Sequence, residues 1–129
     1  MKKVLVLAAL AIVFAATTAA AQSRTLGKAD VPFGFTAHNQ QLGAGSYTVR
    51  QIGRDVLRLE DAQGKGITLI GVAAPASADA ALTFHRYGST YFLAAVNSPV
   101  AGAELPRTTE EKRAASRSRE MTKIALALR

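Results

Sequence analysis

The chain has 129 residues, no cysteine and a formal net charge of +7 at pH 7. Without cysteine the protein has no disulfide, no thiol nucleophile and no cysteine-ligated metal site. The charge is uneven, because residues 107–129 hold seven basic and three acidic side chains whereas residues 22–106 are nearly neutral. This distribution argues against a nucleic-acid partner, which would need a basic surface on the domain itself.

Residues 1–21 have the three parts of a secretory signal peptide: a start with two lysines, an apolar block and a run of small residues. The apolar block is too short to span a bilayer comfortably, so we expect cleavage between Ala21 and Gln22 rather than a membrane anchor. Such a signal in a cysteine-free chain predicts export in a bacterium, to the periplasm or to the exterior.

The segment 22–106 alternates short apolar runs with turns rich in Gly, Asn and Asp, which is typical of β-strands. The predicted strands are residues 31–36, 46–52, 56–60, 67–72, 82–87 and 90–96, with 22–29, 73–81 and 97–106 outside the sheet. About six strands followed by one helix predict a mainly β fold: an antiparallel β-sandwich or a small barrel with a C-terminal amphipathic α-helix. The predicted parts are a signal peptide (1–21), a β-domain (22–106) and a basic helix (107–129).

The C-terminal segment has the pattern of a helix that begins with a capping box, because Thr108 and Glu111 stand three residues apart. The helix is predicted to continue to about Leu128. One face of it carries the apolar residues Met121, Ile124, Ala125 and Leu128. Its basic side chains are Lys112, Arg113, Arg117, Arg119 and Lys123. They form either an ordinary solvated face or an attachment to an anionic envelope surface or polymer.

Five short motifs follow one another along the chain: VPFGF at 31–35, LGAGSYTV at 42–49, FHRYG at 84–88, YFL at 91–93 and ELP at 104–106. In this order they resemble a family of small secreted proteins from soil bacteria, and the resemblance covers nearly all of the chain after the signal. It implies no activity, because none is assigned to that family. The second motif alone is also similar to strands of transthyretin-like β-sandwich domains, which implies a sandwich topology and no chemistry.

The chain holds no Gly-x-Ser-x-Gly motif, no phosphate-binding glycine loop and no His-Glu-x-x-His motif. Its histidines are His38 and His85, and a metal site would need both together with a carboxylate such as Asp30. Nothing in their spacing requires such a site. The sequence therefore predicts no catalytic residue, no metal and no cofactor.

The last predicted hairpin has the two-residue turn Gly88-Ser89, and this turn sets the register so that His85 faces Phe92. The predicted core face carries Leu82, Phe84, Leu93 and Ala95. The opposite face carries Thr83, His85, Tyr87, Thr90 and Phe92. An outer strip of this kind either lies under the C-terminal helix or another sheet, or forms a shallow surface for a sugar, lipid or peptide. In the second case His85, Tyr87 and Phe92 are the ligand-binding residues.

A second candidate site comes from the hairpin around residues 53–55. If these form a three-residue loop, Arg50 faces Arg58, and like charges directly opposite are unfavourable unless something neutralises them. Glu60 on the same face is one counter-ion. An anionic ligand held by both guanidinium groups is the alternative.

These patterns favour an exported, non-enzymatic binding or structural module of the bacterial envelope or exterior. A small-ligand carrier with a cavity inside a β-barrel is the first alternative, and a hydrolase-type enzyme is the second. A packed interior would favour the module and an enclosed apolar cavity the carrier. A cleft that joins His85 to a carboxylate would favour the enzyme.

Overall fold

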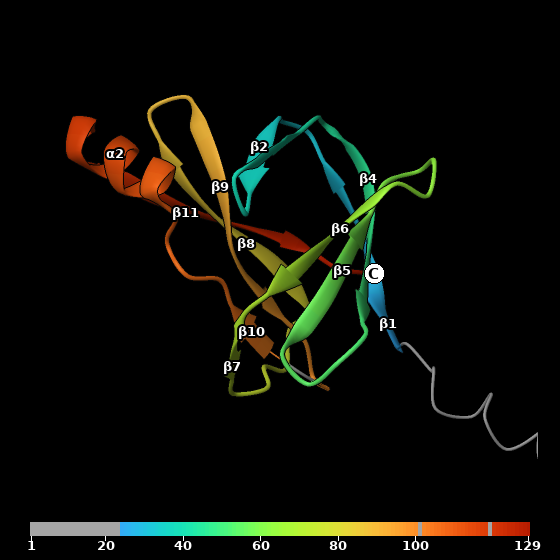
Figure 1. The fold of residues 1–129 in the computed structure, drawn as a ribbon. Helices are drawn as coiled ribbons and strands as arrows, with labels where there is room; N and C mark the ends of the chain where they lie inside the picture. Colours follow the sequence, from blue (N-terminus) through green and yellow to red (C-terminus); the bar gives the residue numbers. More distant parts are fainter. Residues whose placement is uncertain (1–23, 101, 119) are drawn as a thin grey trace, which may run out of the picture.

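The computed structural model describes residues 24–100, 102–118 and 120–129, which form eleven strands and one short helix (Figure 1). The elements are β1 (Arg24–Val31), β2 (Phe35–Ala37), β3 (Gln40–Leu42), β4 (Gly45–Gln51), β5 (Val56–Glu60), β6 (Gly66–Ile70), β7 (Val72–Ala74), β8 (Ala81–Tyr87), β9 (Thr90–Asn97), β10 (Gly102–Glu104), α2 (Thr109–Arg117) and β11 (Met121–Ala127). The expected mainly β fold with one helix near the C-terminus is confirmed, and the helix is short. The predicted signal peptide lies outside the described residues.

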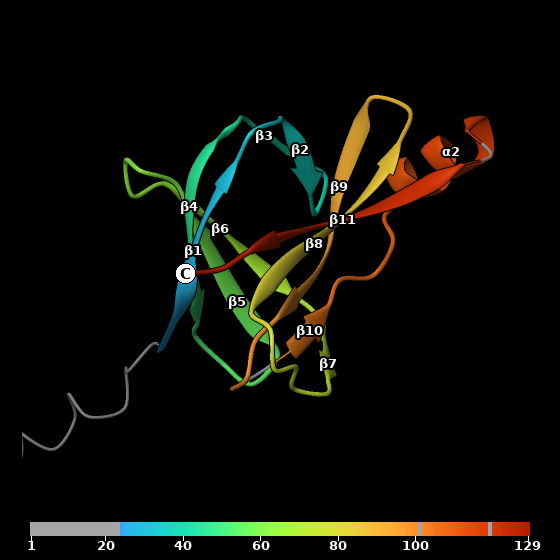
Figure 2. The same ribbon diagram turned by 180° about the vertical axis from the view of Figure 1, so that it is seen from behind.

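Two curled sheets form a half-barrel around one core. The small sheet has the order β1-β4-β5-β6, and the large sheet has the order β11-β8-β9-β10-β7, with the β2–β3 hairpin added beside β9. Along one edge the sheets are joined by two backbone hydrogen bonds, from Lys28 N to Arg129 O at 3.0 Å and from Arg129 N to Lys28 O at 2.9 Å. Figure 2 shows the chain end beside β1 from the opposite side. At the other edge β6 continues through Gly71 into β7, so one segment borders both sheets.

The interior is filled by side chains that alternate along the strands with outward-facing ones. Phe84 is fully buried, and the ring of Phe35 packs edge-on against it at 5.2 Å between centroids. Phe35 also contacts Tyr47 from the small sheet at 5.3 Å. Leucine and valine side chains from both sheets complete the core, among them Val49, Leu59, Leu69, Leu82 and Val96.

The predicted C-terminal helix is wrong beyond Arg117. The helix ends there, and residues 121–127 form β11, which pairs antiparallel with β8 along its whole length. The physical reason is a period of two: Ile124 and Leu126 pack against the core and Leu128 is buried, whereas the residues between them are exposed. A strand at this place also satisfies the open edge of β8.

The segments predicted to lie outside the sheet also contribute strands. Residues 24–31 form β1, and the predicted first strand is divided, since β1 ends at Val31 and β2 begins at Phe35. Pro32, which lacks a backbone donor, lies between them. The short strands β7 and β10 pair with each other within segments predicted to be loops.

Candidate functional site

The β8–β9 hairpin has the predicted register next to its turn. Tyr87 pairs with Thr90, His85 with Phe92 and Phe84 with Leu93. Gly88 has a φ of 63°, as the first central residue of a two-residue hairpin turn requires. Further along, a bulge between Thr83 and Phe84 shifts the pairing, so that Thr83 faces Ala95.

The bulge corrects one predicted position. Ala95 was expected on the core face but shares the outer face with its partner Thr83, and Val96 takes the core position opposite Leu82. A bulge adds one residue to one strand and therefore exchanges the faces of all residues beyond it.

The helix α2 lies beside this hairpin on the side away from the small sheet (Figure 1). Thr108 caps its start, since the hydroxyl oxygen accepts a hydrogen bond from Glu111 N at 3.3 Å. The reciprocal bond of a capping box, from Thr108 N to the Glu111 carboxylate, is absent among the described residues. The Glu111 carboxylate turns instead toward the sheet and is buried, with 4 % of the residue exposed.

Three side chains converge on one oxygen of that carboxylate, Glu111 Oε2. The hydroxyl of Tyr87 donates a hydrogen bond to it at 2.9 Å, His85 Nδ1 lies at 3.1 Å and Arg107 Nε at 3.4 Å. Since a carboxylate only accepts, we assign the proton of the imidazole to Nδ1. We call these four residues the Glu111 cluster. Burial raises the pKa of the Tyr87 hydroxyl above its usual value of 10.0, and the hydrogen bond to Glu111 raises it further.

The cluster covers much of the aromatic strip. Tyr87 and Phe92 are buried, at 5 % and 4 % exposure, and their rings meet edge-on at 5.9 Å between centroids. Tyr87 is bonded to Glu111 of α2 and Phe92 packs on the Tyr87 ring, so these two residues follow the covered alternative and not that of an open surface. His85 is also mostly buried, but its ring reaches an open groove beside the helix.

The groove lies on the outer face of the large sheet and has a volume of about 650 Å³. Its floor is made of small side chains in register across neighbouring strands: Ala125 of β11 pairs with Thr83 of β8, and Thr83 with Ala95 of β9. The polar side chains around this floor are His85, Asn97, Glu104, Arg107 and Lys123. Asn97 Nδ2 donates to Thr83 Oγ1 at 3.3 Å, which leaves the hydroxyl of Thr83 as a further donor on the floor.

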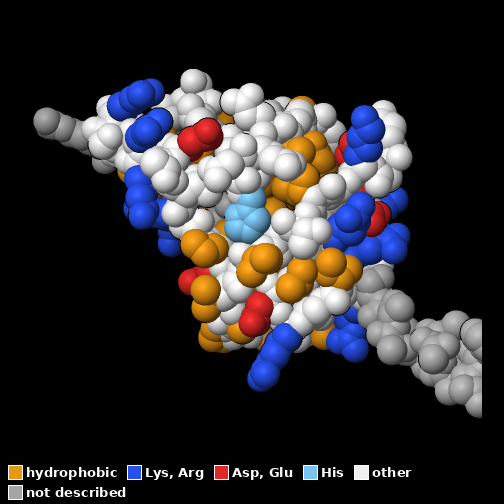
Figure 3. Space-filling view, in the orientation of Figure 1, with side chains coloured by type: hydrophobic (Ala, Val, Ile, Leu, Met, Phe, Trp, Pro, Cys, Tyr) orange, Lys and Arg blue, Asp and Glu red, His pale blue; other side chains and the backbone are white. Residues whose placement is uncertain are grey.

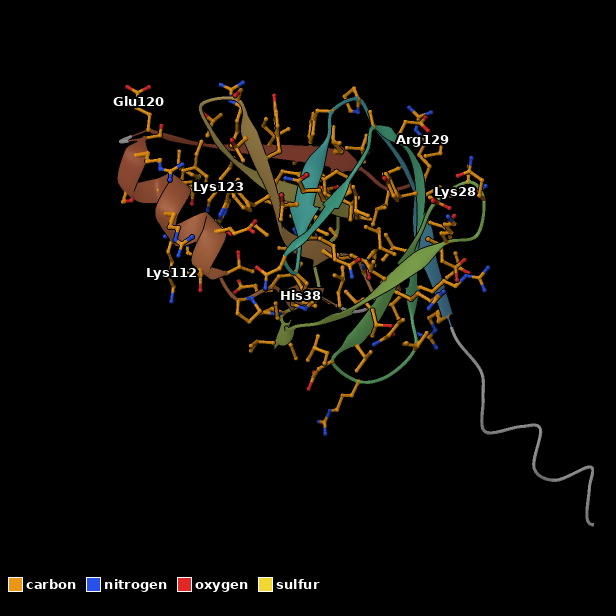
Figure 4. All side chains as sticks on the ribbon, turned by 45° about the horizontal axis from the view of Figure 1, so that its top comes forward. Lys28, His38, Lys112, Glu120, Lys123 and Arg129 are labelled. Atoms are coloured by element: carbon orange, nitrogen blue, oxygen red, sulfur yellow. The ribbon has the colours of Figure 1, made fainter. Side chains whose placement is uncertain are left out.

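The charges of the groove differ in how they are compensated. Arg107 is paired with Glu111, whereas Lys123 and Glu104 make no ion pair with any described residue. No described residue hydrogen-bonds to His85 Nε2, because the cluster uses only Nδ1. In Figure 4 Lys123 lies between α2 and the strands, whereas Lys112 points away from them.

The second candidate site lies on the other sheet. Arg50 and Arg58 face each other across the β4–β5 hairpin as predicted. Glu60 lies between them: its Oε1 is 3.0 Å from Arg58 Nε, and its Oε2 is 3.5 Å from Arg50 Nε. The internal counter-ion is thus present. Arg50 and Arg58 are not brought together with His85, Tyr87 and Phe92, which belong to the large sheet.

The two histidines have different partners. His38 is at the tip of the β2–β3 hairpin, where its Nε2 accepts a hydrogen bond from Ile70 N at 2.9 Å. The aspartate considered with them, Asp30, is hydrogen-bonded by Ser46. Among the described residues no three His, Asp or Glu side chains come together in a group suited to a metal ion.

Four residues of the site were not identified from the sequence: Glu111 as a buried partner, and Asn97, Glu104 and Arg107 as groove residues. Glu111 lies 24 and 26 positions from the residues that it contacts on β8. Its only sequence signal was the capping box, which predicts a local bond and not a contact with the sheet.

Comparison with known proteins adds no family. The chain matches no protein-family model, no curated protein and no solved structure. In the described part of the chain, the helix is not long and apolar enough to cross a membrane. The groove and the Glu111 cluster are therefore the features from which a function follows.

Proposed function

We propose that the protein is an exported binding module of the bacterial envelope or exterior, and that the groove on the large sheet is its ligand site. The single observation that carries this proposal is the groove itself: an open space of about 650 Å³ on a β-scaffold, lined by Lys123 and Glu104, which form no ion pair with any residue that the structure describes. Polar groups placed around a floor of small side chains are the arrangement that fixes a ligand's orientation.

The Glu111 cluster supports this role because it makes one wall of the groove rigid. Glu111 anchors α2 to β8 through Tyr87 and His85, and Arg107 lies on the same carboxylate. A binding site is more selective when its side chains are already held in place before the ligand arrives. A carrier is less well supported, because core side chains from both sheets occupy the interior.

One observation favours a hydrolytic enzyme as the second candidate. His85 joins a carboxylate through Nδ1 and lines the groove, which is how an imidazole is oriented to act as a general base through Nε2. In such a reaction His85 would take a proton from water as the water attacks an ester or amide carbon, and would return it to the leaving group. Lys123 and Arg107 would stabilise the developing oxyanion.

A fragment screen followed by amide chemical shifts tests the binding proposal. Compounds that bind are expected to shift the signals of Thr83, Ala95 and Ala125, and Lys123→Met is expected to weaken those that carry an anionic group. Lys28→Met, an exposed lysine on β1, is the matched control and should change nothing. Ligands that shift only signals of the small sheet would contradict the proposal. If the wild type hydrolyses an ester or amide fragment and His85→Ala does not, the hydrolase would be established instead.

We further propose that α2 attaches the module to an anionic envelope surface or polymer. Lys112, Arg113 and Arg117 are exposed on α2, and Figure 3 shows Lys and Arg side chains over this end of the molecule. The other two residues of the expected basic set do not add to this face: Lys123 belongs to β11, and Arg119 lies outside the described residues.

Co-sedimentation with anionic vesicles at low and high salt tests this attachment. Each basic side chain near such a surface contributes about 1 kcal/mol, and salt screens the attraction. Replacement of Lys112, Arg113 and Arg117 by Gln is expected to abolish binding at low salt. The same number of changes at Arg24, Arg54 and Lys65, which lie on the small-sheet side, is the control. Binding that salt does not change would show that charge is not its cause.

A further inference from the structure

We infer that the groove takes a short zwitterionic peptide, lying across the strands with its carboxylate near Lys123 and its amino group at Glu104. This inference rests on the proposed binding function of the groove. It starts from two charges of opposite sign that line one open space and have no ion pair among the described residues. A ligand that carries both charges compensates both at once.

The register of the large sheet places these charges at opposite sides of the groove. Ala125, Thr83, Ala95 and Glu104 pair successively across β11, β8, β9 and β10, so they form one row with Glu104 at its end. Lys123 is two residues from Ala125 and therefore faces the same side of β11. Three strand spacings separate β11 from β10, which is about 14 Å.

This separation matches the length of an extended peptide of about four residues, since each residue spans roughly 3.3–3.6 Å. The small side chains of the floor allow a backbone to lie close to the sheet. The hydroxyl of Thr83, the amide of Asn97 and Nε2 of His85 stand along the path as hydrogen-bonding groups. A peptide backbone offers both donors and acceptors to such groups.

The side of the groove proposed for the peptide carboxylate offers more than one hydrogen-bond donor. Lys123 pairs with His85 in the ladder between β11 and β8, and Arg107 is held near His85 by their shared bond to Glu111. Only Nε of Arg107 contacts Glu111, no described residue bonds to its Nη groups, and its side chain is half exposed. A carboxylate at this end would therefore receive charge-assisted hydrogen bonds from Lys123 and Arg107.

Titration with tetra-alanine, followed by calorimetry and amide chemical shifts, tests the inference. The free peptide is expected to bind and to shift Thr83 and Ala95. N-acetyl tetra-alanine and tetra-alanine amide are each expected to bind at least tenfold more weakly, because each lacks one terminal charge.

Variants show which end lies where. Lys123→Met is expected to weaken the free peptide tenfold but to leave the C-terminal amide unaffected, and Glu104→Gln to weaken the free peptide but not the N-acetyl form. Both residues are exposed, so the variants should fold, and amide spectra check this. Lys28→Met is the control.

The outcomes are separable. Equal binding of free and capped peptides, or no binding of tetra-alanine while other fragments shift the groove signals, overturns the peptide inference and leaves the binding function standing. Absence of any groove ligand in both experiments overturns both.

Discussion

Two carboxylates of this molecule each hold several donors, one on the outer face of each sheet. Glu60 lies between Arg50 and Arg58 on a single hairpin, and its side chain is 20 % exposed. Glu111 lies under α2 with only 5 % of its side chain exposed and joins the helix to β8. The first cluster neutralises a local repulsion, whereas the second holds two distant segments together.

The difference is one of burial and of sequence distance. A partly exposed ion pair contributes little to stability, because water and salt screen it. Removing one partner of a buried charged pair lowers the free energy of unfolding much more, because the other partner stays buried without compensation. We therefore expect substitutions in the Glu111 cluster to unfold the protein more readily than substitutions around Glu60.

The largest effect is expected at Tyr87. Tyr87→Ala removes a buried ring that contacts Phe92 and leaves a cavity, so the free energy of unfolding should fall by about 3 kcal/mol or more. Denaturant unfolding measures it. Tyr87→Phe keeps the ring and is the matched control, expected to lose far less. A small loss for Tyr87→Ala would mean that the ring is an exposed ligand surface and not part of the packing.

Glu111→Gln is expected to have the next largest effect. The amide keeps the shape but not the charge that accepts from Tyr87, His85 and Arg107, and the loss should be about 2 kcal/mol. Hydrogen exchange should then become faster along α2, because the helix loses its attachment to β8. Glu110→Gln, the exposed neighbour, is the control and should leave both measurements unchanged. Equal effects of the two changes would show that Glu111 does not anchor the helix.

Much of the β-domain follows from local signals in the sequence. The turn Gly88-Ser89 and the loop 53–55 specify registers that the structure confirms, including Arg50 opposite Arg58. What was not predictable depends on contacts between distant segments. Residues 121–127 become a strand because β8 has a free edge there, and this overrides the helical spacing of their apolar residues. The groove likewise needs Arg107 and Lys123, which only the fold brings to β8.

High pH provides a smaller and more specific test of the Glu111 cluster. The pKa of Tyr87 is raised by burial and by Glu111, so the folded protein keeps the proton at a pH where the unfolded chain releases it. This contribution to stability is complete below pH 10 and declines as the pH rises through the folded-state pKa. Tyr87→Phe should therefore lose less stability than the wild type above pH 10, as measured by denaturant unfolding at several pH values. Burial also raises the pKa of Tyr47, so the stability of Tyr87→Phe should still decline somewhat at alkaline pH.

The smallest effect is expected at Glu60. Glu60→Gln removes the counter-ion of Arg50 and Arg58, and because these side chains are partly exposed the cost should be at most about 1 kcal/mol. The two guanidinium groups then face each other without a carboxylate, which is the arrangement that binds an anion. Phosphate should therefore raise the melting temperature of Glu60→Gln more than chloride does at equal ionic strength. The wild type and Asp79→Asn, a change at an exposed aspartate that has no hydrogen bond or ion pair among the described residues, should respond equally to the two salts. If phosphate stabilises the wild type as strongly as the variant, Glu60 does not occupy the anion position, and the arginine pair is available to a ligand in the native protein.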